Sequence, residues 1–213
     1  MSEYNFDQSY PGQVICLPDG QIQHTYTRDL RDSIIVHSGR FFWPLSAHVD
    51  DVRVEDIAWG LAHENRFSGQ TDCPYTVAQH SVMLSHIVPP DLSRWALFHD
   101  ATEAYMKDIP RPIKQWMPQY KDHESRLMRV IAEAVGLDPL DEPDELKPWD
   151  TRIAHAEMLW LMPKIGRLKL QLTESVLTVH EEALSAIFTM FEPKNSVESY
   201  EEFMSRYAEL FPK

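Results

Sequence analysis

The stretch Trp95-Ala96-Leu97-Phe98-His99-Asp100-Ala101-Thr102-Glu103 joins an apolar run directly to three ionisable residues. On an α-helix, Glu103 shares a face with His99, four positions before it, and with Asp100, three positions before it. The apolar run places this cluster against the core, where unpaired ionisable groups are costly to bury. We therefore expect the cluster to have a partner, and a divalent cation would supply one.

Helical patterns continue on both sides of this stretch. Apolar residues recur at i, i+3, i+4 and i+7 over residues 54–61, as in an amphipathic helix. Thr76 is placed to cap a helix that Pro89-Pro90 ends. Asp91 is placed to cap the next helix, which carries the quoted stretch to about Met106.

Prolines and glycines predict where the later helices begin and end. Three prolines make a continuous helix over residues 107–120 unfavourable. A helix closes at Gly136, and an acidic loop with three prolines follows over residues 138–148. The remaining patterns predict helices at about 149–162, 174–191 and 198–210. The expected fold class is therefore all-α, a compact helical bundle.

The N-terminal part has a different character. Residues 1–32 are polar and aperiodic and contain prolines and glycines, so we expect an irregular N-terminal extension. Ile34-Ile35-Val36 and Phe41-Phe42-Trp43 then flank Ser38-Gly39, a pattern that predicts a short hairpin. Residues 33–213 are expected to form a single helical domain.

Composition and charge restrict the class of protein. The 213 residues are 43% apolar and 25% charged, which is typical of one soluble globular domain. A formal net charge of −13 argues against binding to duplex nucleic acid or to an anionic membrane, because both require a basic face. No apolar run approaches the ~20 residues of a membrane span. With two cysteines and no signal-peptide pattern, we expect a cytoplasmic protein.

Further metal ligands must come from other helices. His80 lies inside an apolar stretch, where an unpaired imidazole is unfavourable, and Asp150 follows Pro148-Trp149 at the start of a helix. Taken singly, such residues are more often a hydrogen-bonded core histidine and a helix cap. Two imidazoles and two carboxylates together suit a borderline divalent metal such as Zn, Mn or Co, with positions left open for water and substrate.

Three motifs resemble the HD-domain metal-dependent phosphohydrolases. They are Val77-Ala78-Gln79-His80-Ser81, Ala96-Leu97-Phe98-His99-Asp100-Ala101-Thr102-Glu103-Ala104-Tyr105 and Asp108-Ile109-Pro110-Arg111-Pro112-Ile113-Lys114. The resemblance extends from about Ser38 to Glu157 and is strongest to bacterial 5′-deoxyribonucleotidases and phage dATP triphosphohydrolases. It implies an HD-domain helical bundle that hydrolyses the phosphate ester of a small-molecule nucleotide with a metal-activated water.

The resemblance also assigns the site residue by residue. The four metal ligands of the family fall on His80, His99, Asp100 and Asp150. The catalytic glutamate falls on Glu103. For the last ligand, Asp141 and Asp144 are alternatives, but they lie in a loop without apolar flanks.

Residues 107–121 hold four basic side chains against the single acidic Asp108, which is unusual in so acidic a chain. Charge alone fits either a phosphate-binding loop or a solvated basic loop. The resemblance favours Lys114 and Arg66 as phosphate contacts and Asp108 as a contact to the sugar hydroxyl. Trp43, within an aromatic run, is a candidate wall for the base, although such runs are more often core.

Three functions remain open from the sequence. A nucleoside monophosphatase and a deoxynucleoside triphosphate triphosphohydrolase share the same chemistry and differ only in the room needed for extra phosphates. Guanosine-tetraphosphate hydrolases of the superfamily carry an acidic residue where this chain has Ala104. The third function is a catalytically silent HD domain that binds or regulates. Relatives often assemble as dimers or larger, so a homo-oligomer is compatible with the resemblance.

Overall fold

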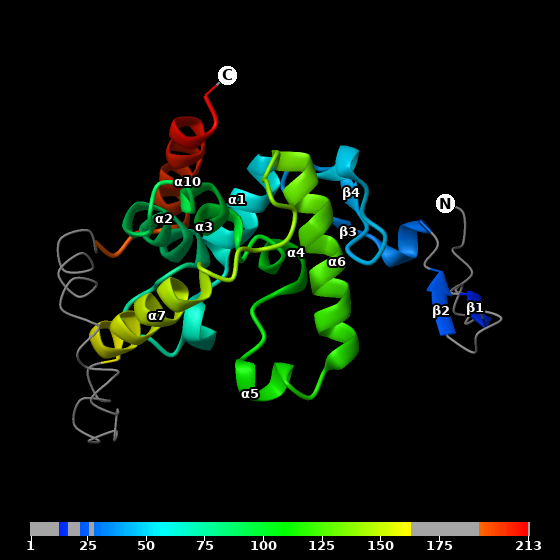
Figure 1. The fold of residues 1–213 in the computed structure, drawn as a ribbon, viewed down its shortest axis with the longest axis horizontal. Helices are drawn as coiled ribbons and strands as arrows, with labels where there is room; N and C mark the ends of the chain where they lie inside the picture. The colour runs from blue at the N-terminus through cyan, green and yellow to red at the C-terminus, as the bar shows by residue number, and fades with distance from the viewer. Residues whose placement is uncertain (1–12, 17–21, 26–27, 163–191, 213) are drawn as a thin grey trace, which may run out of the picture.

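The computed structural model describes residues 13–16, 22–25, 28–162 and 192–212, and they form a mainly helical fold (Figure 1). The expectation of a mainly α fold is confirmed. The helices are α1 (Val54–His63), α2 (Val77–Ile87), α3 (Ser93–Phe98), α4 (Glu103–Met106), α5 (Arg111–Lys114), α6 (Pro118–Val135), α7 (Lys147–Leu161) and α10 (Ser196–Leu210). Among the described residues, none of these helices is long and apolar enough to cross a membrane.

The expectation of an irregular extension over residues 1–32 is wrong in part. Strands β1 (Gln13–Cys16) and β2 (Ile22–Thr25) pair antiparallel, with Gln13 opposite Thr25. A 3-10 helix follows at Leu30–Asp32. The β-branched residues in both strands favour extended structure, and the prolines and glycines around them hid this signal in the sequence.

The predicted hairpin is confirmed. Strand β3 (Ile34–Ile35) pairs antiparallel with β4 (Phe41–Phe42). Several contacts fasten the hairpin to the helical body, among them the stacking of His37 on Trp59 of α1. The backbone N–H of Ser38 donates to Oδ1 of Asp56 on α1 at 2.7 Å, and the ring of Phe42 stacks on Tyr105 with ring centroids 3.9 Å apart.

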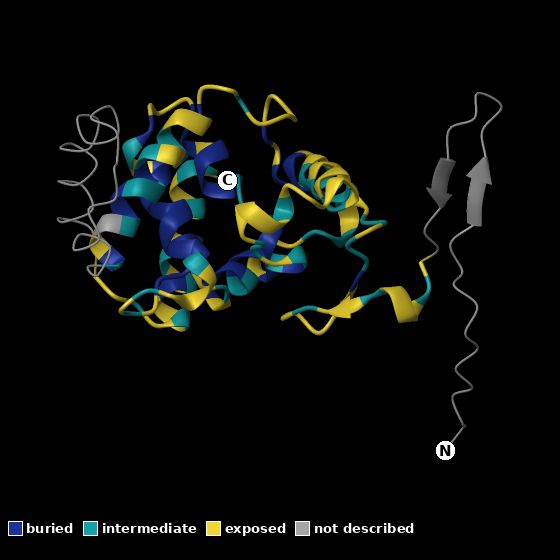
Figure 2. Ribbon diagram, turned by 90° about the horizontal axis from the view of Figure 1, so that it is seen from below, coloured by how far each residue is buried: buried dark blue, intermediate teal, exposed yellow. Residues whose placement is uncertain are grey.

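Helix α2 is buried over most of its length. Figure 2 shows the buried segments gathered inside the helical part of the fold. Helix α2 packs against α1, α3, α7 and α10. Thr76 and Gln79 form the capping box at its start, as the sequence predicts for Thr76. All residues from Val77 to Ser85 are buried. Gln79, His80 and Ser85 have hydrogen-bond partners inside the protein, whereas Oγ of Ser81 has none among the described residues.

The single helix expected over residues 91–106 is broken in the structure. Helix α3 ends at Phe98, a tight turn spans residues 99–102, and α4 begins at Glu103. Within the turn, backbone N–H groups bond to carbonyls three residues back, as from Glu103 to Asp100 at 3.0 Å. Leu92, not Asp91, is the N-cap of α3, because a backbone bond from Leu92 to Pro89 closes the preceding turn.

The later boundaries follow the prolines and glycines. Residues 107–117 hold only the short helix α5, and Pro118 stands at the first position of α6. Gly136 ends α6 with a left-handed φ of 75°. Helices α7 and α10 match the expected segments at 149–162 and 198–210, with starts two residues earlier. The helix expected at 174–191 lies outside the described residues.

Gly60 allows a close approach of α1 to α4. A Cβ atom at this position would lie 2.7 Å from Cβ of Ala104 and 2.8 Å from its Cα. We expect Gly60→Ala to lower the free energy of unfolding by about 1–3 kcal/mol, because overpacking outweighs the gain in helix propensity. Urea denaturation would measure this, with the exposed Ser205→Ala as control. Equal stability of the two variants would contradict the close approach.

Candidate metal centre

Three helical segments bring two imidazoles and two carboxylates to one place. His80 lies on α2 and is fully buried, and His99 and Asp100 stand in the tight turn after α3. Asp150 lies in the first turn of α7, which packs against α2. His80, His99 and Asp150 each offer a ligand atom, and these three atoms lie within 4.8 Å of one another.

The distances between these atoms suit a shared cation. Nε2 of His80 lies 3.3 Å from Nε2 of His99 and 3.2 Å from Oδ1 of Asp150. Oδ2 of Asp100 lies 3.1 Å from Nε2 of His99 and 3.9 Å from Nε2 of His80. Two ligand atoms on one tetrahedral zinc lie about 3.4 Å apart, given Zn–N bonds of about 2.1 Å. The donor set therefore fits a divalent transition metal.

The other nitrogen of each imidazole has a separate partner. Nδ1 of His80 lies 2.6 Å from Oε1 of Glu157, and Nδ1 of His99 lies 2.8 Å from the carbonyl oxygen of Ala96. With a proton on Nδ1 donated to these acceptors, each Nε2 presents its lone pair to the centre of the cluster. Metal-binding histidines in proteins are oriented in this way.

Glu157 is a site residue to which the sequence interpretation gave no role. Its side chain is 1% exposed, and its Oε1 accepts from the hydroxyl of Tyr75 at 2.7 Å. Nε of Arg66 donates to its Oε2 at 3.0 Å. Glu157 follows Asp150 by seven residues, two turns along α7, which is the sequence signal that could have placed it beside the cluster.

Buried charges shift the pKa values of the ligands in opposite directions. Burial alone would lower the pKa of His99, but Asp100 and Asp150 outweigh it and raise the pKa to about 10. Burial would raise the pKa of Asp150, but the hydrogen bond and charge of His80 lower it to about 2. The pKa of Asp100 is held well below its usual range, because His99 and Arg66 outweigh burial. The cluster therefore binds protons at the positions a cation would occupy.

Glu103, the predicted catalytic residue, lies beside this cluster. It is the first residue of α4 and is 7% exposed. Its Oε2 is buried and has no hydrogen-bond partner among the residues that the structure describes. Burial is the main cause that raises the pKa of Glu103 to about 10, and the charges of Asp100 and Asp108 add to it. An unpartnered buried carboxyl oxygen is costly, so Glu103 is suited to act on a bound molecule.

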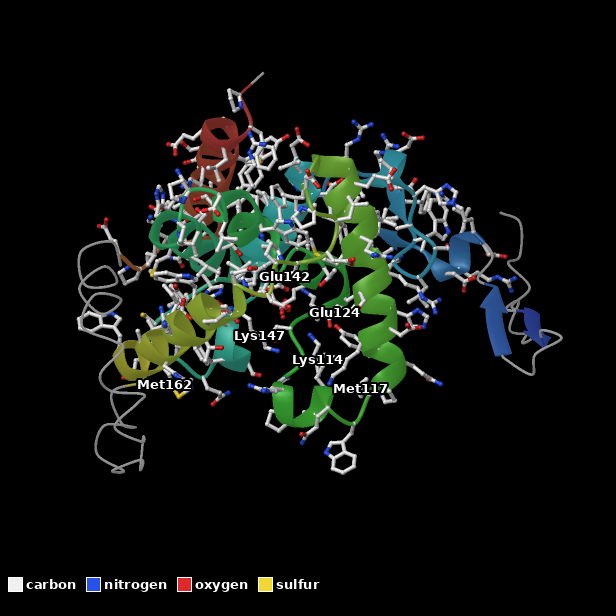
Figure 3. The ribbon with its side chains drawn as sticks, viewed as in Figure 1. Lys114, Met117, Glu124, Glu142, Lys147 and Met162 are labelled. Carbon is white, nitrogen blue, oxygen red and sulfur yellow. The ribbon has the colours of Figure 1, made fainter. Side chains whose placement is uncertain are left out.

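A cavity of about 660 Å³ connects the candidate residues. Six of the nine residues expected in the site line it: Arg66, Asp100, Glu103, Asp108, Lys114 and Asp150. Two apolar side chains line it as well, Met158 on α7 and Met162 directly after it. Lys114 reaches from α5 to Oε1 of Glu124 on α6, and Figure 3 shows these two side chains near each other and Met162 at the far end of α7.

Trp43 is not brought to this cavity in the described part of the chain. Its Nε1 donates to the carbonyl oxygen of Asp29 at 2.8 Å, and the guanidinium of Arg28 lies over its ring at 4.3 Å. The expected role of Trp43 as a wall for a base therefore has no support in its position. Asp141, one alternative ligand, forms an exposed ion pair with Arg129 instead.

Comparison with known proteins gives no activity. No family model matches the chain. It is 44% identical over 103 residues to the uncharacterized protein YfdR of Escherichia coli K12, and 36% identical over 110 residues to the uncharacterized protein RCAP_rcc00048 of Rhodobacter capsulatus. The matches cover 48% and 47% of this chain and 58% and 56% of the two relatives, so the chain spans less than two thirds of either relative.

In the metal-free protein, we expect the free energy of unfolding to fall as the pH rises from 7 to 10. The pKa of His99 is about 10 in the folded state and about 6.5 in the unfolded state, so the folded state holds its proton over this range. That stabilisation is complete below pH 6.5 and is lost as the pH rises through 10. Urea denaturation after chelation would measure it. His99→Asn should make the profile less steep, and the remaining slope comes from Glu103, whose pKa is also raised to about 10.

Glu157→Gln tests how the imidazole of His80 is oriented. The amide keeps the shape of the side chain but loses the charge shared by His80, Tyr75 and Arg66. We expect a drop of about 10–100-fold in affinity for Zn²⁺ or Co²⁺, which is typical when the partner of a ligating histidine is removed. Metal titration would measure it, with the exposed Glu133→Gln as control. Unchanged affinity would separate Glu157 from metal binding.

Proposed function

We propose that this chain is a metal-dependent phosphohydrolase of the HD-domain type that acts on small-molecule nucleotides. The observation that carries this proposal is the convergence of the Nε2 atoms of His80 and His99 with Oδ1 of Asp150, three ligand atoms within 4.8 Å of one another. Asp100 beside them completes the two-imidazole, two-carboxylate set that the motifs imply. The mainly helical fold is compatible with an HD-domain bundle.

The nature of the donors points to hydrolysis. When bound, a Zn, Co or Mn ion supplies Lewis acidity, which lowers the pKa of water and neutralises charge on a phosphoryl group. Side chains around the cavity would bind the phosphate and the sugar of the nucleotide. Arg66 and Lys114 neutralise phosphoryl oxygens, and Asp108 accepts from a sugar hydroxyl.

Glu103 is the proposed catalytic residue. Its Oε2 has no hydrogen-bond partner among the described residues, although it is buried at the lining of the cavity. This oxygen orients a water molecule or passes a proton to the leaving oxygen of the nucleotide. The resemblance places Glu103 outside the four metal ligands, which leaves this oxygen available for a water molecule or the substrate.

The volume of the cavity does not decide between a nucleoside monophosphate and a nucleoside triphosphate as substrate. A volume of about 660 Å³ is within the usual range for small-molecule sites, and it accommodates a monophosphate or a triphosphate. A panel of deoxy- and ribonucleotides therefore decides between a nucleotidase, which releases phosphate, and a triphosphohydrolase, which releases triphosphate. Metal uptake without turnover of any nucleotide would favour the catalytically silent binding module instead.

Glu103→Gln separates metal binding from catalysis. We expect this variant to keep its metal and to lose at least about 100-fold in kcat, because general acid–base groups contribute about 10²–10⁴-fold. Metal analysis and chromatography of all products would measure the two effects. Asp100→Ala, which should lose both, excludes a contaminating enzyme, and Glu133→Gln is the matched control. A fully active Glu103→Gln protein would overturn the assignment.

A further inference from the structure

The backbone is strained between Glu103 and Asp108, two of the carboxylates that line the cavity. Lys107 follows α4 with φ 73° and ψ 150°, a conformation that residues with a Cβ rarely adopt. Its backbone N–H donates to the carbonyl oxygen of Glu103 at 3.0 Å, and the next residue is Asp108. Lys107 therefore connects the proposed catalytic residue to a proposed substrate contact.

The strained turn explains why both carboxylates line one cavity. On a continuous helix, Asp108 would lie about 140° around the axis from Glu103, since each residue advances about 100°. The positive φ of Lys107 ends α4 and redirects the chain. Glu103 and Asp108 then both line the cavity of about 660 Å³.

Tyr120, on α6, holds this turn from outside the cavity. Its hydroxyl lies 2.8 Å from the carbonyl oxygen of Met106 and 2.8 Å from that of Lys107, so it donates to one or the other. Its ring lies 5.8 Å from Nζ of Lys114. One side chain therefore contacts both the strained turn before Asp108 and the lysine expected to bind phosphate.

A second contact to the turn comes from the residue that follows α1. Nζ of Lys107 lies 2.6 Å from Oε2 of Glu64, the residue that follows α1. Tyr120 and Lys107 are not among the described residues that line the cavity. Neither residue is therefore placed to touch a molecule bound there, and any effect on substrate must act through Asp108 and Lys114.

We propose that Tyr120 is a positioning residue, which clamps the strained turn at Lys107 so that Asp108 and Lys114 face the substrate together. This rests on the proposed function for its effect on catalysis. The clamp sets the affinity for substrate. It does not contact the metal ligands, so metal binding is independent of it.

Tyr120→Phe tests the clamp, because it removes the hydroxyl and keeps the ring beside Lys114. We expect KM to rise about fivefold, as for the loss of one hydrogen bond, with kcat within about twofold and metal content unchanged. Amide hydrogen exchange over residues 107–114 should become faster. Tyr207→Phe on α10 is the matched control. Unchanged KM together with unchanged exchange would overturn the proposal.

Lys107→Val and Lys107→Gly test the turn itself. Both variants lose the ion pair with Glu64, and they differ in how readily the backbone adopts a positive φ. We expect KM of the valine variant to be about tenfold above that of the glycine variant, with equal metal content. Equal KM values for the two variants would show that the positive φ at position 107 does not affect substrate affinity, which would contradict the proposed role of the strained turn.

The exchange experiment also separates this proposal from the proposed function. If the unaltered protein turns over no nucleotide but Tyr120→Phe speeds exchange over residues 107–114, the clamp stands and the phosphohydrolase proposal fails. If nucleotides are turned over and Tyr120→Phe changes neither KM nor exchange, the clamp fails and the phosphohydrolase proposal stands.

Discussion

The buried carboxylate of Glu157 is the interaction on which the rest of the site depends. It lies on α7 and contacts His80 on α2, Tyr75 before α2, and Arg66 in the preceding loop. An isolated buried charge would destabilise the fold. Here an opposite charge and two hydrogen-bond donors surround the carboxylate and offset the cost of burying it. These contacts fix the distance between α2 and α7, and that distance decides whether His80 and Asp150 can share a cation.

Two departures from regular helix complete the arrangement that Glu157 begins. The tight turn over residues 99–102 stops α3, so that the imidazole of His99 and the carboxylate of Asp100 reach the same centre. The strained turn at Lys107 then redirects the chain toward the cavity. Strained backbone concentrates at functional sites, where surrounding contacts outweigh its cost. Here the hydroxyl of Tyr120 and the carboxylate of Glu64 supply such contacts.

The sequence predicted the features that depend on neighbouring residues, such as where helices begin and end. The capping residue Thr76 and the left-handed Gly136 mark real helix ends, and the motifs around His80 and His99 identify side chains that the fold brings together. Glu157 and Tyr120 were missed because their roles depend on contacts between distant segments. The contacts of Trp43 with Asp29 and Arg28 were not predictable for the same reason, since an aromatic residue in a sequence carries no information about which surface it covers.

Under the proposed function, the charges around the cavity would make a cation important for substrate binding as well as for chemistry. Arg66 is paired with Glu157 and Asp100, and Lys114 is paired with Glu124. With their charges already balanced, these side chains offer a phosphate little net attraction, and Asp108 and Asp150 oppose it. A divalent ion held by His80, His99 and Asp150 would reverse that balance. In an acidic chain, an anionic substrate would then bind only where the metal is bound.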